Sequence, residues 1–394
     1  MVLPGGVAAS AARAYGLLPE SLASRVLPSK LRYDPHTLPI TEAPDTGVRA
    51  LIAPTNFAGQ GWQWARAMER SLPDVGAVAM SFAVGPGYGF PVDVSVPASA
   101  YVLSRSWRRR ERAAVLGGFT HVFIESGRHP LGGVYEERLD EQVRALRDAG
   151  VAVAFIGHGT DVRVPSAHAQ REPDSPFGSR AEFVGIEGIE AQARANLQLI
   201  RRMSLPAFVS TPDLLDDVPG ATWLPVVIEP ERWRSSHSVL QGDRPVVVHA
   251  PSDGPLKGSD LIDPVMSRLH DEGIVEYRRI SGVPAADMPG VYRQADIVLE
   301  QFRIGSYGVA ACEALAAGRL VIGNVGPHVR ARVAAYGREL PIAQSTAADL
   351  RETILRVLEE RAAFRELAAL GPGFVRDMHD GGRAADAVRD FLGR

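Results

Sequence analysis

Residues 296–323 have the sequence DIVLEQFRIGSYGVAACEALAAGRLVIG, and this stretch decides the fold. The apolar run at 296–299 predicts a buried strand, 306–317 predict a helix, and 320–323 predict the next strand. Apolar strands that alternate with helices are typical of a parallel sheet covered on both faces. The stretch therefore predicts an α/β protein.

The same alternation continues on both sides of this stretch. In the second half of the chain, strands are predicted at 245–249 and 274–280, and helices at 259–271, 285–295 and 347–370. In the first half, a helix is predicted at 62–70, and the strand candidates are 48–53, 76–82, 121–125, 151–156, 207–210 and 222–227.

Two such runs of similar size predict two Rossmann-like, doubly wound lobes that face each other across a cleft. The first lobe is predicted at residues 1–228, with an irregular lead-in at 1–46, and the second at 229–375. Residues 376–394 are expected to form a helix that returns to the first lobe. In such sheets ligands bind beyond the carboxyl ends of the strands, so functional residues are sought in the loops that follow strands.

The composition excludes several classes of function. The formal net charge of −3 gives no basic field of the kind that a dedicated nucleic-acid-binding protein carries. The single cysteine, Cys312, rules out a disulfide within the chain. Because no apolar run approaches the ~18–20 residues of a membrane span, we expect a cytoplasmic protein. The basic cluster at 105–112 favours a solvated helix face, and it leaves peripheral membrane contact open.

Two loops in the first half hold candidate site residues. Gly59 and Gly61, with Asn56 beside them, let the backbone approach a ligand just before a helix begins. The loop GHGTDVR at 157–163 places His158 between glycines at the end of a strand, where it can reach into a cleft. Asp161 and Arg163 follow in the same loop and could position this histidine or bind a ligand.

The loop before the predicted helix 306–317 is the most informative one. It contains Gly305, Ser306, Tyr307 and Gly308, and Val309 follows them. Free backbone N–H groups at a helix start bind phosphate, and glycines remove steric hindrance to a close approach. The sequence therefore predicts a phosphate-binding turn here.

Two charged side chains complete this prediction. Glu313 lies about two turns along the predicted helix, where its carboxylate could accept hydrogen bonds from ribose hydroxyls. Lys257 is, with Lys30, one of only two lysines, and it follows the strand at 245–249. Its ammonium could neutralise a leaving diphosphate. No Asp-x-Asp pair occurs in the sequence, which favours positive side chains and helix dipoles over a metal-bridged diphosphate, and no metal site is predicted.

At these residues the chain resembles the family 4 glycosyltransferases, a retaining GT-B group that uses nucleotide-sugar donors. The resemblance is specific in the second half, in HAPSDGPLKGSD (249–260), ISGVPAADMPGVYRQADIVLEQ (280–301) and IGSYGVAACEALAAGRLVIG (304–323). In the first half it is looser, in PTNFAGQGWQWARAMER (54–70), GHGTDVR (157–163) and STPDLL (210–215).

The resemblance implies roles for residues of both lobes. In the second lobe, Lys257 would bind the donor diphosphate and Glu313 the ribose, while the backbone at 306–308 would hold phosphate or sugar. The nucleotide base would rest against the loop around Gly282 and Val283.

In the first lobe, the resemblance implies that His158 faces the donor sugar near its anomeric carbon. Gly59 and Gly61 would form a loop that closes over donor and acceptor.

The sequence departs from the family's pattern at two positions. The family has a glutamate eight residues before the one that matches Glu313, and here that residue is Gly305. It has an arginine five residues before the lysine that matches Lys257, and here that residue is Ser252, which we expect to contact the donor. These changes leave three alternatives: an unusual donor sugar, reduced activity, or substitution by another group such as Arg303 or Arg330.

The sequence thus predicts a retaining, metal-independent glycosyltransferase of the hexosyltransferase type, without a cofactor. The expected donor is a UDP- or GDP-sugar, and the acceptor hydroxyl could belong to a glycan, a lipid-linked molecule or a natural product. Two alternatives stay open. One is a sugar-nucleotide epimerase of the same fold, and the other is a catalytically silent nucleotide-binding or accessory protein.

Overall fold

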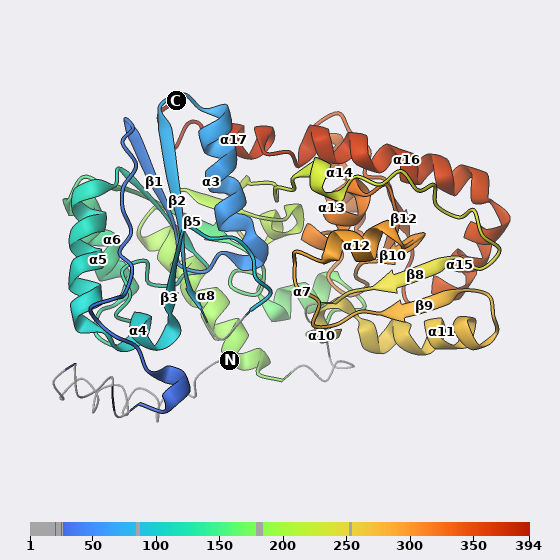
Figure 1. Cartoon of the computed structure of the whole chain (residues 1–394), viewed down its shortest axis with the longest axis horizontal. Helices are drawn as coiled ribbons and strands as arrows, with labels where there is room; N and C mark the ends of the chain where they lie inside the picture. Colours follow the sequence, from blue (N-terminus) through green and yellow to red (C-terminus); the bar gives the residue numbers. More distant parts are fainter. Residues whose placement is uncertain (1–19, 21–24, 26, 84–86, 179–183, 252–253) are drawn as a thin grey trace. The chain divides into compact units, whose positions relative to one another are not determined.

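The computed structural model describes residues 20, 25, 27–83, 87–178, 184–251 and 254–394 (Figure 1). Contacts divide the chain into two compact units. The first unit comprises Met1–His158, Asn196–Phe208 and Val388–Arg394. The second comprises Gly159–Ala195 and Val209–Ala387.

The first sheet has the strand order β3-β2-β1-β4-β5-β6-β7. Its central strands run parallel: Leu51 of β1 lies opposite Val78 of β2 on one side and Val122 of β4 on the other. The central strands β1, β2, β4 and β5 are almost continuously apolar and buried, as expected for a parallel sheet with both faces covered. The strands of this sheet are β1 (Val48–Ala53), β2 (Val75–Ala83), β3 (Val94–Pro97), β4 (His121–Glu125), β5 (Ala152–Gly157), β6 (Ala207–Val209) and β7 (Thr222–Trp223).

Helices connect these strands. The helix after β1 buries Trp64, Ala65 and Met68 at positions that share one helical face, which is why this segment packs on the sheet. The end of the chain also packs in the first unit, since the Phe391 ring lies 5.0 Å from the Phe123 ring. The helices between β1 and β7 are η2 (Phe57–Gly59), α3 (Gln60–Ser71), α4 (Ala98–Leu103), α5 (Arg105–Gly118), α6 (Leu139–Asp148), α7 (Pro165–Arg171), α8 (Ile186–Arg202) and η3 (Pro212–Asp216).

The second sheet has the strand order β12-β11-β10-β8-β9, and all of its neighbouring strands pair in parallel. Successive residues of β10 alternate between two cores: Val298 packs into one, and Ile297 and Leu299 pack into the other. Each face of the sheet therefore has its own apolar layer. The strands are β8 (Val246–His249), β9 (Glu276–Arg279), β10 (Ile297–Leu299), β11 (Leu320–Gly323) and β12 (Ile342–Gln344).

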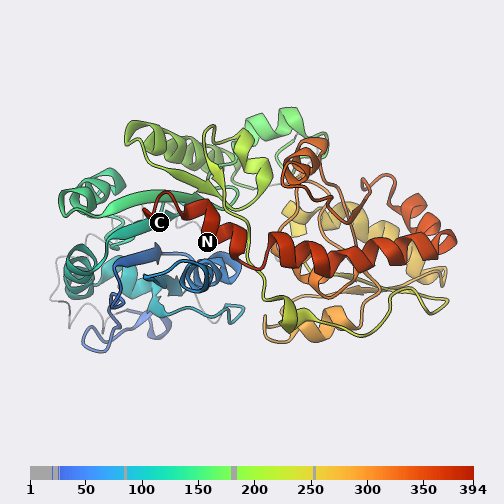
Figure 2. The ribbon, with the colours of Figure 1, turned by 90° about the horizontal axis from the view of Figure 1, so that it is seen from above.

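Helices cover both faces of this second sheet (Figure 1). The long helix α16 runs along one face, as Figure 2 shows, and its Phe374 and Val375 join the core that contains Val298. Ile262 and Met266 of α11 belong to the opposite core. The helices are α9 (Pro230–Trp233), α10 (Gly254–Lys257), α11 (Ser259–Asp271), α12 (Met288–Arg293), α13 (Val309–Ala316), α14 (Pro327–Ala334), α15 (Leu350–Glu359), α16 (Arg361–Met378) and α17 (Gly382–Val388). A short helix, η1 (Ser29–Leu31), precedes the first sheet.

Each sheet has one point at which its strand order reverses. In the first sheet this switch point lies between β1 and β4, and in the second it lies between β8 and β10. Ligands of doubly wound sheets bind beyond the carboxyl ends of the strands at such points. The loops after β1, β4, β8 and β10 are therefore the places at which the fold positions a site.

The two parallel sheets with their covering helices confirm the predicted pair of Rossmann-like, doubly wound lobes. The strands predicted at 48–53, 121–125 and 320–323 and the helix predicted at 259–271 have the predicted bounds.

Several element predictions are wrong in part, and the helix predicted at 285–295 spans only Met288–Arg293. The helix predicted at 306–317 begins only at Val309, because residues 305–308 form a glycine-containing loop in which Gly305 has a φ of +72°. The strand predicted at 222–227 ends at Trp223. The helix predicted at 347–370 is two helices, α15 and α16, separated at Glu360, whose ψ of 36° is not helical.

The basic cluster of α5 uses several of its arginines within the chain. Arg108 pairs with Glu136, Arg112 Nη1 lies 2.9 Å from Glu137 Oε2, and Arg110 donates to the Pro35 carbonyl. Among the described residues no helix is both long and apolar enough to cross a bilayer.

Candidate functional site

In the first unit, His158 lies at the end of β5 and contacts Glu125, the last residue of β4. His158 Nε2 is 3.0 Å from Glu125 Oε1, and the histidine ring packs against Phe57 and Trp64. Burial opposes the charge of Glu125, yet hydrogen bonds from His158 and the Asn56 and Thr55 amides hold its pKa below the ordinary value. An ionised Glu125 makes Nε2 the protonated ring nitrogen of His158.

The loop after β1 is fixed by Asn56 and by the same glutamate. The Asn56 side chain accepts a hydrogen bond from the Trp62 amide (3.0 Å) and donates one to the Pro91 carbonyl (2.9 Å). A Cβ on Gly61 would lie 3.2 Å from Asn56 Oδ1, and Gly59 has a φ of +74°, which favours glycine. Asn56 thus supports the loop that contains Gly59 and Gly61.

In the second unit, Lys257 ends α10 and its ammonium contacts the carboxylate of Glu300, the residue that follows β10. Glu300 is buried, whereas Lys257 keeps about a fifth of its side chain exposed. The same Glu300 Oε1 lies 3.9 Å from the position that a Cβ on Gly308 would take. The ammonium of Lys257 and the loop before α13 are therefore brought together through Glu300, at the switch point of the second sheet.

The two side chains of the loop at 305–308, Ser306 and Tyr307, are buried. The Tyr307 side chain lies in the core, where its hydroxyl is 3.2 Å from His379 Nε2, and the Ser306 hydroxyl is buried. Gly308 is the N-cap of α13, and Val309 is its first residue. The amides at the start of α13 have no partner within the helix and are available to a phosphate.

Glu313 lies in α13 and is half-buried. Burial raises its pKa to about 8, opposed by the positive charges of Arg232 and Lys257. No described residue forms a hydrogen bond or ion pair with its carboxyl group. Since a buried polar group without a partner is costly, this carboxyl group is suited to a ligand that donates hydrogen bonds.

The predicted base-binding loop lies after β9. Gly282 is exposed with a φ of +69°, a Cβ there would meet nothing within 4 Å, and Val283 is half-buried. Ser252, the remaining predicted donor contact, lies outside the described residues.

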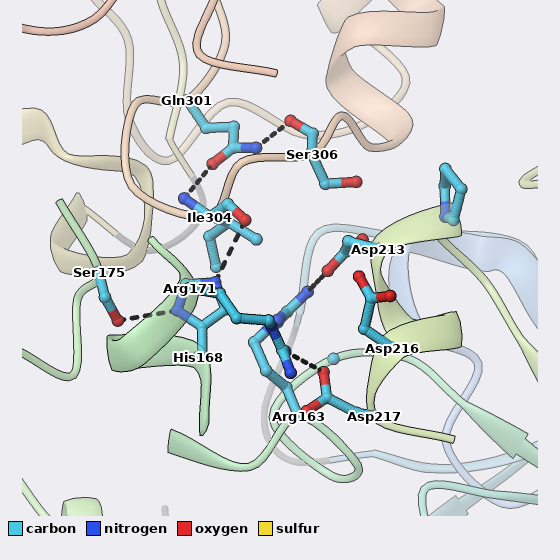
Figure 3. Close-up of polar contacts among 12 residues, drawn as sticks. Arg163, His168, Arg171, Ser175, Asp213, Asp216, Asp217, Gln301, Ile304 and Ser306 are labelled. Carbon is cyan, nitrogen blue, oxygen red and sulfur yellow. Dashed lines mark hydrogen bonds and ion pairs between the residues drawn. The ribbon is translucent and has the colours of Figure 1, made fainter. Parts of the chain in front are cut away.

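Asp161 and Arg163 serve the local structure of the second unit. Asp161 Oδ1 accepts a hydrogen bond from the Gly159 amide at 2.6 Å. Figure 3 shows Arg163 directed at Asp213, 2.5 Å away, and both side chains are buried. Burial opposes ionisation of Asp213, but the Arg163 charge keeps its pKa below the ordinary value.

The two arginines expected to substitute for missing family residues are bound elsewhere. Arg303 donates to Asp260 Oδ2 (2.5 Å) and to the Asp174 carbonyl (3.3 Å). Arg330 donates to the carbonyls of Leu340 and Ile342.

Sequence reasoning missed three charged residues. Glu125 and Glu300 stand directly at the ends of the apolar runs HVFI and DIVL. A carboxylate at the end of an apolar strand, next to a switch point of the sheet, is a pattern from which Glu125 and Glu300 could have been predicted. Arg232, whose charge acts on Glu313, gives no such signal, because it lies in a segment that reads as a linker. The described residues contain no group of three or more His, Cys, Asp or Glu side chains placed to hold a metal ion.

Comparison with known proteins gives structural matches only. No family model and no curated protein matches the sequence. A structure of Anabaena HepE in complex with UDP and glucose matches with a TM-score of 0.55 and 12% identity, over 87% of this chain and 98% of that one. Sucrose-phosphate synthase from Thermosynechococcus elongatus matches with a TM-score of 0.54 and 12% identity, over 87% and 98%.

A third match is an α-glucosyltransferase in complex with UDP and a DNA 13-mer that contains an HMU base. Its TM-score is 0.55, with 11% identity over 88% of this chain and 100% of that one. These likenesses, together with the two doubly wound sheets, show that the chain has the GT-B fold.

Proposed function

We propose that this protein is a retaining glycosyltransferase that moves a hexosyl group from a nucleotide-sugar to an acceptor hydroxyl. The observation that carries the proposal is the arrangement at the switch point of the second sheet. There the Lys257–Glu300 pair adjoins the loop before α13, and Glu313 on the same helix has a half-buried carboxyl group with no hydrogen-bond or ion-pair partner among the described residues.

The chemistry of these groups matches a nucleoside diphosphate. The Lys257 ammonium and the amides at the start of α13 are two sources of positive potential for a diphosphate. Glu313 offers two oxygens to ribose hydroxyls. Structures of HepE with UDP and with UDP-glucose support a uridine nucleotide as the first candidate, and GDP-sugars remain the second.

In the proposed reaction the bond between the anomeric carbon and the β-phosphate oxygen breaks, and a bond to the acceptor oxygen forms on the same face. The leaving phosphate takes the acceptor's proton, so no protein nucleophile is required. Lys257 and the α13 amides stabilise the charge that develops on the diphosphate. His158, held by Glu125, is proposed to face the donor sugar. The reaction is proposed to need neither a metal ion nor a cofactor.

The test is turnover of nucleotide-sugars by the full chain. UDP-glucose, UDP-galactose, UDP-N-acetylglucosamine and GDP-mannose are each incubated with the protein and a panel of glycan, lipid-linked and phenolic acceptors, with and without EDTA. We expect acceptor-dependent release of the nucleoside diphosphate that EDTA does not abolish. NMR of the product is expected to show the anomeric configuration of the donor.

The two lysines provide a matched pair of variants. Lys257→Ala is expected to lower turnover at least a hundredfold, because a charge that acts on the transition state is lost. Lys30→Ala removes the same side chain from η1 and is expected to keep wild-type turnover. Turnover that survives Lys257→Ala, or nucleotide binding by the wild type without any turnover, contradicts the proposal. The second result would favour a silent nucleotide-binding protein.

A further inference from the structure

The carboxylate of Glu172 occupies the space beside Gly305. A Cβ added to Gly305 would lie 2.5 Å from Glu172 Oε1 and 2.8 Å from Oε2, so no side chain fits at position 305 while Glu172 stays there. The φ of +72° at Gly305 disfavours other residues as well. The segment after α7 thus brings a carboxylate to the position from which a side chain on residue 305 would begin.

Contacts on both sides fix this placement. His168 Nε2 lies 3.2 Å from the Ile304 carbonyl, and Arg303 Nη1 donates to the Asp174 carbonyl at 3.3 Å. Figure 3 shows the His168–Ile304 contact and the hydrogen bond from Ser175 that orients the ring. Burial lowers the pKa of His168 to about 4, so the ring is neutral at pH 7 and Nε2 carries its proton.

Residues on either side of Glu172, His168 and Asp174, therefore contact Ile304 and Arg303, the two residues before Gly305. Because these two contacts join the segment of Glu172 to that of Gly305, His168 and Arg303 are positioning residues for the carboxylate.

The Glu172 side chain is half-buried, and among the described residues none forms a hydrogen bond or an ion pair with its carboxylate. The nearby arginines are engaged, Arg163 with Asp213 and Arg171 with Asp217. Burial raises the pKa of Glu172, and the charge of Asp213 raises it further.

The surroundings also define the ligand class. A half-buried carboxylate next to Asp213 repels anions and accepts hydrogen bonds from neutral donors. It lies beside the loop that precedes α13, the loop to which the proposed function assigns the diphosphate. A hydroxyl-rich group attached to that diphosphate is the neutral donor that fits.

We propose that Glu172 binds hydroxyl groups of the donor sugar and thereby supplies, from the segment after α7, the carboxylate that position 305 lacks. This inference rests on the proposed function and deepens it. It assigns to Glu172 the recognition of the sugar and not of the nucleotide.

The test compares affinities for a nucleotide with and without its sugar. Calorimetry with UDP, UDP-glucose, GDP and GDP-mannose is run on the wild type, Glu172→Gln and the control Glu187→Gln, which neutralises an exposed carboxylate of α8. For the sugar nucleotide that binds the wild type, Glu172→Gln is expected to lower affinity about tenfold, because hydrogen bonds to a charged acceptor are lost. Its affinity for the free diphosphate is expected to stay within about twofold, and Glu187→Gln is expected to match the wild type for every ligand.

Stability separates recognition from a structural role. Since the unpaired carboxylate costs free energy in the folded state, Glu172→Gln is expected to keep or raise the unfolding midpoint at pH 8. Equal loss of affinity for the free diphosphate and the sugar nucleotide, with a lowered midpoint, would show a structural role and overturn the inference.

Unchanged affinity for both ligands would overturn it too, while leaving the proposed function intact. Failure of the wild type to bind any of the four nucleotides would remove the proposed function and this inference together.

Discussion

At the scale of single residues, Glu313 shows most clearly that the fold maintains a costly group. Its half-buried carboxyl group on α13 has no hydrogen-bond or ion-pair partner among the described residues, and burial raises its pKa to about 8. In the unfolded chain the same group releases its proton near 4.5. The folded protein therefore loses stability as the pH rises from about 4.5 to 8, because only the unfolded state releases the proton easily.

This gives the first prediction. Glu313→Gln removes the titration, so the variant should be more stable than the wild type at pH 8, by on the order of 4–5 kcal/mol for a shift of about 3.5 pKa units at about 1.4 kcal/mol each. The difference should shrink towards zero near pH 5. Urea unfolding from pH 5 to 8 measures it, with Glu352→Gln, an exposed change on α15, as the control. A gap that does not depend on pH would show that Glu313 is ionised in the folded protein.

The residue scale also shows how far the sequence could predict the site. Lys257 and Glu313 could be predicted from residue type and spacing, since each follows a strand of the second sheet. The ion pair of Lys257 with Glu300 could not, because only the pairing of β8 with β10 brings those two loops together. Glu172 could not be predicted for the same reason: its contact with Gly305 joins segments 133 positions apart in the numbering, and no local pattern encodes it.

At the scale of elements, the loop before α13 is held from the core side by the end of α16. His379, which follows α16, is buried, with Nδ1 2.8 Å from the Val226 carbonyl and Nε2 3.2 Å from the Tyr307 hydroxyl. Burial lowers its pKa to about 4, so the ring is neutral and donates from Nδ1. The contribution of His379 to the free energy of unfolding is complete above pH 6.5 and is lost as the pH falls from 6.5 through 4.

The second prediction concerns this connection. The wild type should lose about 3 kcal/mol from His379 between pH 6.5 and 4, since the unfolded histidine binds a proton first. His379→Gln should unfold more easily at pH 7 but lose stability less steeply on acidification. Guanidinium unfolding at four pH values tests this, and His36→Gln changes an exposed histidine as the control. Parallel curves for wild type and His379→Gln would refute the assignment.

The bounds of a strand were predicted well where the strand is buried on both faces. They were predicted poorly where tertiary packing determines at which residue an element begins or ends. Val48–Ala53 and His121–Glu125 end where their apolar runs end. The break between α15 and α16 has no local signal of that kind, because the residues on both sides favour helix. The start of α13 does have one, because Gly305 and Gly308 disfavour helix, and the prediction did not use it. Edge strands such as β3 and β12 were missed, since runs of four and three residues are too short to show a period.

At the scale of the whole molecule, each unit is a doubly wound sheet with charged residues beyond its switch point. Glu125 with His158 occupies that position in the first unit, and Glu300 with Lys257 occupies it in the second. The alternation of strands and helices was enough to predict this architecture. The GT-B likeness, at 11–12% identity, extends over 87–88% of the chain.

The central claim is that Lys257 and the start of α13 recognise a diphosphate. The measurement that tests it most directly is the affinity of the protein for UDP relative to UMP, repeated with GDP and GMP. Calorimetry on the wild type should show at least a tenfold preference for one nucleoside diphosphate over its monophosphate. Lys257→Ala should lose most of that preference, and Lys30→Ala should retain it. Equal affinities for mono- and diphosphate in the wild type, or a preference that survives Lys257→Ala, would contradict the account.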